Sequence, residues 1–408
     1  MRRYLQFGVG MVLLMALAAP GMSQGNYNVS STVDLSTLTR ENFEATLLPV
    51  AQQQGSLTVY NFDTFFEPML AEINRRFTER YGIGVTVVTV DSDTAVQQLI
   101  AERQAGAPSA ADVFLFASDS IRAALSGGVV AQIPLLDILP NAINLDPNVA
   151  GFTRGVRNNG WAVPFHRNQA ALAYLSDQVS DPPDTLQELR DFACANPGKV
   201  ALTNPYEGGS GATFLEAVAL ELAGPREDYY NFDLTEEQAG DLVDSRWQAV
   251  YEYFRSLLAC GTFFTNSNVE SEQVLATGAA LVATVWEDCT FTFVLNGTVP
   301  PTVRLTMLAS GHPGGGDDVM VVAGTQKVEA ALLYVNFLMS QEVQLYKLQE
   351  YASRSARQDL DTSMIGAERR DALVPQEQYV TRSVPRINSL IREVAEDSFA
   401  AEVLSQAR

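Results

Sequence analysis

The sequence is poor in the side chains that carry metal and nucleophilic chemistry. Its 408 residues include 3 cysteines and 2 histidines, and no CxxC pair occurs. We therefore expect no cysteine zinc site, no other metal site and no resident cofactor. The GxxxxGK phosphate loop, HExxH, GxSxG and the EF-hand loop are also absent. We expect a protein that is not an enzyme, and a hydrolase using His166 or His312 is the less favoured alternative.

Positive charge is also scarce. Lysine and arginine number 27 against 48 acidic residues, so the net charge is −21. Such a surface repels nucleic acid phosphates and anionic lipids, so we expect no nucleic acid partner and no peripheral membrane role. The 47% apolar and 18% charged content is typical of a globular chain, and the length fits two domains.

Long apolar runs are confined to the N-terminus. Arg2 and Arg3 precede an uncharged apolar run over residues 7–19, and small residues follow. This pattern predicts a signal peptide over 1–23, because the run is shorter than the roughly 20 residues of a membrane span. An N-terminal helix of the mature fold is the alternative. Residues 24–54 are expected to form a leader and a helix.

The three cysteines allow one disulfide in an oxidising compartment. The sequence does not decide which two pair. We favour Cys194 with Cys260, because both fall at predicted helix ends, and this leaves Cys289 over.

Strand and helix patterns alternate after residue 55. Apolar runs predict strands at 57–62, 85–90 and 112–116, and amphipathic or glycine-ended stretches predict helices at 66–82, 91–106 and 118–128. This order predicts an α/β fold with a mostly parallel sheet and right-handed crossovers.

Polar loops follow the first and third of these strands. Ligands of parallel α/β sheets bind outside the carboxyl ends of the strands, which makes Asp63, Thr64, Phe65, Ser118 and Asp119 candidate ligand residues. Asp63 suits an amine, and Phe65 can hold a cation against its ring. The structural alternative is that Asp63 caps the following helix.

Two later stretches add candidate ligand residues, one favouring an anion and the other a cation. "EGGSGATF" places Ser210, Gly211 and Thr213 at a helix start, where backbone N–H groups favour an anion; a plain helix cap is the alternative. "VWEDCTF" reads as a strand that runs into a charged aromatic loop, and its ring and two carboxylates suit an organic diamine. Those residues are Trp286, Glu287 and Asp288; a buried ring with two solvated acids is the alternative.

The order of these features resembles a known family. The stretches that carry the resemblance are "GSLTVYNFDTFFEPMLAEINRRFTERYGIGVTVV", "ADVFLFASDSIRAALSGGVV", "VPFHRNQAALAYLSD", "NPYEGGSGATFLEAVALEL" and "ALLYVNFLMSQEVQLYKLQEYASR". Together they span roughly residues 55–355. They are similar to the bacterial extracellular solute-binding proteins of ABC transporters, of the two-lobed type that carries polyamines, iron or thiamine.

The resemblance implies a two-lobed, type II-like periplasmic-binding-protein fold. Lobe one would comprise 55–163 plus 312–408, and lobe two 164–311, with crossings near 163–167 and 310–318. His166 and Arg167 would then face the cleft, where the arginine fork suits a carboxylate or phosphate; a salt bridge that stabilises the crossing is the alternative.

The resemblance also implies the mode of action. A monomer in the periplasm of a Gram-negative cell would close by a hinge around a small-molecule solute and present it to an inner-membrane ABC permease. Because Asp63, Asp119, Glu287 and Asp288 accompany aromatic rings, we favour an organic cation such as a polyamine. An anionic or phosphorylated small molecule, bound through Arg167 and the glycine-rich helix start, is the alternative.

Overall fold

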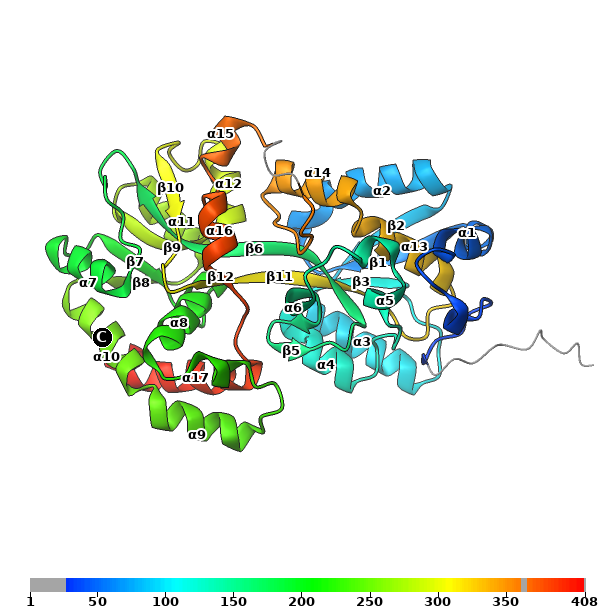
Figure 1. Ribbon diagram of the computed structural model, residues 1–408, viewed down its shortest axis with the longest axis horizontal. Coiled ribbons are helices and arrows are strands. Elements are labelled where there is room, and N and C mark those ends of the chain that lie inside the picture. Colours follow the sequence, from blue (N-terminus) through cyan, green and yellow to red (C-terminus); the bar gives the residue numbers. More distant parts are fainter. Residues whose placement is uncertain (1–26, 361–364, 407–408) are drawn as a thin grey trace, which may run out of the picture.

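The computed structural model describes residues 27–360 and 365–406 (Figure 1). The predicted signal peptide lies outside the described residues. Across these residues, none of the helices combines the length and the apolar character that a membrane span requires.

The first part of the chain forms the predicted strand–helix alternation. Its elements are η1 (Leu35–Thr37), α1 (Phe43–Gln54), β1 (Ser56–Asn61), η2 (Thr64–Phe66), α2 (Glu67–Tyr81), β2 (Gly84–Thr89), α3 (Ser92–Gln104), β3 (Val113–Phe116), η3 (Ser118–Ser120), α4 (Ile121–Ser126), α5 (Leu135–Ile138), η4 (Pro140–Ala142), α6 (Pro147–Ala150), β4 (Phe152–Thr153) and β5 (Val156–Arg157). Strand β1 pairs in parallel with both β2 and β3. Helix α2 ends at Gly82, whose left-handed backbone (φ 70°) suits glycine.

The middle of the chain forms a second α/β unit. Its elements are α7 (Leu186–Ala195), β7 (Val200–Thr203), α8 (Gly209–Leu222), η5 (Arg226–Tyr230), α9 (Glu236–Arg246), α10 (Gln248–Ala259), β8 (Phe263–Thr265), α11 (Asn268–Ala276), β9 (Val282–Trp286), α12 (Glu287–Leu295) and β10 (Val303–Thr306). Strand β7 pairs in parallel with β8 and β9. A disulfide joins Cys194, at the end of α7, to Cys260, which follows α10; this is the pairing that the sequence favoured.

Two long strands join these units. Strands β6 (Ala162–Leu175) and β11 (His312–Val321) pair with each other in antiparallel fashion and run between the two halves of the molecule (Figure 1). Strand β11 also pairs with β3, and β6 pairs with β9 and β10. The sheet order is β2-β1-β3-β11-β6-β9-β7-β8. The two-lobed α/β class expected from the sequence is confirmed.

The C-terminal part divides between the lobes. Its elements are α13 (Val328–Leu338), α14 (Gln341–Tyr351), α15 (Ala367–Arg370), α16 (Gln376–Arg382), β12 (Ser383–Val384), α17 (Ser389–Glu402) and η7 (Leu404–Gln406). Helix α13 packs in the core of lobe one with α1, α2 and β1. Helix α17 instead buries Ile391, Ala395 and Phe399 in the core of lobe two, and lies below α8 in Figure 1.

The expectation that all of 312–408 belongs to lobe one therefore does not hold for α17, which packs on lobe two. Its amphipathic pattern marks one apolar face but does not say which core that face covers. Phe399 packs edge-on against Phe254 of α10, with ring centroids 4.8 Å apart. This contact places the end of the chain with lobe two.

Candidate functional site

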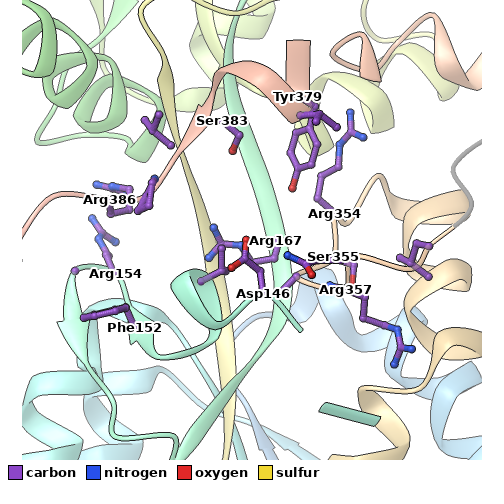
Figure 2. Close-up of a pocket in the computed structure, with 18 of the residues that line it drawn as sticks. Asp146, Phe152, Arg154, Arg167, Arg354, Ser355, Arg357, Tyr379, Ser383 and Arg386 are labelled. Carbon is purple, nitrogen blue, oxygen red and sulfur yellow. Dashed lines mark hydrogen bonds between the residues drawn. The ribbon is translucent and has the colours of Figure 1, made fainter. Parts of the chain in front are cut away.

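A cavity of about 820 Å³ lies between the lobes (Figure 2). It is lined from the 146–155 segment of lobe one, the crossing strand β6, the chain after α14, α16 and the segment that precedes α17. Its arginines are Arg154, Arg167, Arg354, Arg357 and Arg386. Among the described lining residues, Asp146 alone carries a carboxylate. The lining is therefore rich in arginine although the whole chain is strongly acidic. Four of the five guanidiniums are ion-paired to carboxylates outside the lining, namely Asp119, Glu287, Asp359 and Glu216.

Arg167 is the central member of this set. In the parts of the chain that the structure describes, no side chain is hydrogen-bonded or ion-paired to its guanidinium within the usual distances. Gly316 faces it from β11 with a φ of 155°, and a Cβ there would crowd the Arg167 side chain and the His166 carbonyl. The glycine thus leaves room for an arginine whose donors are available to a ligand.

His166 points the other way, because successive side chains of a strand alternate between faces. Its Nδ1 lies 2.8 Å from Ser353 Oγ, and its Nε2 lies 3.0 Å from Asp288 Oδ2. Burial lowers the pKa of His166, whereas the hydrogen bond to Asp288 acts in the opposite direction. His166 does not line the cavity; it ties β6 to α12 and to the chain after α14.

Glu287 holds one of the lining arginines. Arg354 Nε and Nη2 donate to Glu287 Oε2 and Oε1 at 2.8 and 2.7 Å, and the two side chains are 4% and 0% exposed. The Arg354 guanidinium also lies over the ring of Tyr379, 4.2 Å from its centroid. Trp286 ends β9, and Glu287 and Asp288 begin helix α12, which corrects the expectation of a charged loop at this point.

A second group of arginines lies at the other end of the cavity. Arg154 pairs with Asp119, and Arg392 Nη2 lies 3.8 Å from the same carboxylate. Arg386 Nε donates to Glu216 Oε1 at 2.8 Å. Burial, followed by repulsion from Arg392 and Arg386, lowers the pKa of Arg154 to about 10. A bound anion would offset that repulsion.

The other predicted ligand residues of lobe one do not line the cavity. Asp63 Oδ1 accepts a hydrogen bond from Phe65 N at 2.9 Å, so it caps η2, whose first residue is Thr64. Phe65 is 36% exposed. Ser118 Oγ donates to the Gly316 carbonyl and is buried. Asp119 does not line the cavity itself. It pairs with Arg154, which does, and lies close to Arg392.

The predicted anion site at the start of α8 is internal. Ser210 Oγ lies 2.8 Å from both Thr203 Oγ1 and Asn268 Oδ1, and Thr213 Oγ1 donates to carbonyls of the preceding turn. A Cβ at Gly211 would collide with the Thr203 carbonyl. Trp286 packs against Gly209 and Gly315, where a Cβ would meet its indole ring. These residues build lobe two and do not line the cavity.

Of the predicted ligand residues, only Arg167 lines the cavity. Sequence reasoning missed the other arginines, as well as Tyr379 and Ser383. The one weak sequence signal for Arg154 is the stretch "FTRGVR", in which Arg-Gly occupies a two-residue turn. Arg354 ends a stretch that carried the family resemblance but was not predicted to contact ligand, and the remainder lie beyond it, where we recognised no motif. Over the described residues, no group of three or more His, Cys, Asp or Glu side chains could hold a metal ion.

Known proteins share this architecture. The family model of the bacterial extracellular solute-binding proteins matches residues 72–368. Protein YnjB of Escherichia coli K12 is 24% identical over 296 residues, which cover 70% of this chain and 74% of that protein.

Solved structures agree in fold. The spermidine/putrescine substrate-binding protein PotD of Streptococcus pneumoniae has a TM-score of 0.61 at 14% identity and covers 85% of this chain and 99% of its own. AfuA of Actinobacillus pleuropneumoniae, with fructose-6-phosphate bound, has a TM-score of 0.58 at 15% identity and covers 86% and 99%. Because the family model matches most of its length, this chain belongs to the bacterial extracellular solute-binding proteins.

Proposed function

We propose that this protein is the periplasmic substrate-binding component of an ABC importer and that it captures an anionic solute in the cavity between its lobes. The guanidinium of Arg167, which has no side-chain partner among the described residues and lies at the centre of an arginine-rich lining, carries this proposal. The family membership and the ABC transporter proteins of the same fold support the transport role. The solute would be handed to an inner-membrane permease after hinge closure.

The anionic alternative is favoured here over the organic cation, because the candidate carboxylates already have partners. Asp119 is paired with Arg154, Glu287 with Arg354, and Asp288 with His166. An amine would have to displace an arginine or a histidine from each of them. Asp63 accepts from the backbone N–H of Phe65 and lies outside the cavity lining.

A thermal-shift screen with matched anions and cations tests this proposal. A ligand at a hundredfold excess over its Kd stabilises the folded state by about 2.7 kcal/mol, which raises the melting temperature measurably. We expect carboxylates and organic phosphates to stabilise the protein, and spermidine and putrescine to leave it unchanged. Stabilisation by polyamines alone would overturn the anionic assignment while leaving the transport role intact.

The variant Arg167→Gln tests whether Arg167 binds the anion. Since a hydrogen bond to a charged group contributes roughly 1.5–3 kcal/mol, we expect this variant to weaken anion binding by about 10- to 100-fold in a calorimetric titration. Arg75→Gln is the matched control, because Arg75 lies exposed on α2 and pairs only with Glu72 and Glu79 of its own helix within the described residues. Equal affinity in the two variants would exclude Arg167 as the anchor.

A further inference from the structure

The cavity groups that can donate a hydrogen bond to an anion fall into two separate sets (Figure 2). Arg154 and Arg386 lie together at one end, and Tyr379 with Arg354 lies at the other, with Arg167 between them. After burial, repulsion from Arg392 and Arg386 contributes most to lowering the pKa of Arg154. The charge of Arg167 instead acts to lower the pKa of Tyr379 and of Asp318. A single small anion would therefore engage one set and leave the other unused.

Arg154 occupies a backbone position that arginine does not favour. It stands at the tip of the β4–β5 hairpin with a φ of 45°, followed by Gly155 with a φ of 78°. Two-residue hairpin turns with both φ values positive prefer Asn-Gly or Asp-Gly. Its Nε is also buried without a hydrogen-bond partner among the described residues. Closing the hairpin requires neither an arginine at this positive φ nor a buried Nε without a partner. We therefore infer that the arginine side chain has a role beyond the turn.

The hairpin tip also touches the other lobe. Ser389 N donates to the Gly155 carbonyl, and Arg392 Nη1 donates to the Arg154 carbonyl, both at 3.4 Å. A Cβ at Gly155 would collide with the carbonyl of Ile387. Arg154 of lobe one and Arg386, which leads into α17 of lobe two, are therefore brought together by the contact between the lobes.

Building on the anionic solute proposed above, we propose that the solute carries two acidic groups. One binds Arg167, and the other lies between Arg154 and Arg386, where it clamps the two lobes. A cavity of about 820 Å³ far exceeds the space that a single inorganic oxyanion needs. The solute class is a small organic diacid, such as a dicarboxylate or a phosphorylated carboxylic acid.

Calorimetric titration of matched probe pairs tests this inference. The diacids glutarate, adipate and 3-phosphoglycerate are compared with the monoacids pentanoate and hexanoate and with glycerol 3-phosphate. We expect the best diacid to bind at least about tenfold more tightly than its monoacid partner, because it gains a second charge-assisted contact. Equal affinities within every pair would overturn the two-group inference and leave the anionic function standing. Failure of every anion to bind would overturn both.

The variant Arg154→Asn assigns the second acidic group. Asparagine suits the positive φ of this turn position, so the variant should fold with an unchanged or higher melting temperature. We expect the affinity ratio between diacid and monoacid to fall below about threefold, and Arg154→Lys to restore part of it. Arg75→Gln should leave the ratio as in the wild type. An unchanged ratio in Arg154→Asn would remove Arg154 from the site.

Discussion

The buried ion pair between Arg354 and Glu287 leads to a quantitative prediction. It joins the chain after α14 to the start of α12, and Glu287 Oε1 accepts a further hydrogen bond from Val374 N at 2.6 Å. Replacing one partner of a buried pair leaves the other charge unpaired and costs roughly 3–5 kcal/mol. Glu287→Gln keeps the shape and one acceptor oxygen, so we expect the free energy of unfolding to fall by about 3 kcal/mol, the lower end of that range.

Urea unfolding followed by circular dichroism measures this loss. The matched control is Asp371→Asn, which removes the partner of Arg304 in a pair at 3.2 Å whose side chains are 32% and 65% exposed. Exposed pairs contribute about 1 kcal/mol or less, so the control should lose far less stability. If Glu287→Gln costs no more than the control, Arg354 is compensated by other groups and the reasoning fails.

Three further predictions concern pH, the disulfide and closure. Burial raises the pKa of Glu272 to about 8, so the stability contributed by its protonated form is present below pH 4.5 and is lost as pH rises through 8. Glu272→Gln should therefore melt higher than wild type at pH 9 and about equally at pH 5; equal melting at both contradicts this. Replacing Cys194 and Cys260 by serine should cost about 2–4 kcal/mol in urea unfolding, whereas Cys289→Ser should cost less. A saturating anion should reduce the radius of gyration in small-angle scattering, and an unchanged radius with bound ligand would argue against hinge closure.

The local architecture of lobe one was predictable because its signals are local. Strand β1, helix α2 and strand β2 follow from side-chain periodicity and from the glycine that ends α2. The cap at Asp63 could be anticipated as the structural alternative, since a short acidic side chain before a helix commonly accepts a backbone N–H. None of these features requires knowledge of a distant segment.

The orientation of side chains at the crossing could not be read in the same way. His166 and Arg167 are neighbours in the chain, yet one is buried against Asp288 and the other lines the cavity. Which of them faces the cavity depends on the register of β6 against β11. That register is decided by pairing across about 150 residues of chain, and no local pattern specifies it.

The sequence by itself determined the α/β class and the family, because periodicity and motif order are properties of the chain; it favoured Cys194 with Cys260 without deciding the pairing, which the structure supplies. Only the tertiary structure decided which charged side chains pair with one another around the cavity. It pairs Glu287 with Arg354 and Asp119 with Arg154, so carboxylates that resembled an amine site are already occupied. It also gathers arginines from segments more than 200 residues apart around Arg167. A pocket's charge is the sum over distant segments after pairing, and in this pocket Arg167 is the lining arginine that has no carboxylate partner among the described residues.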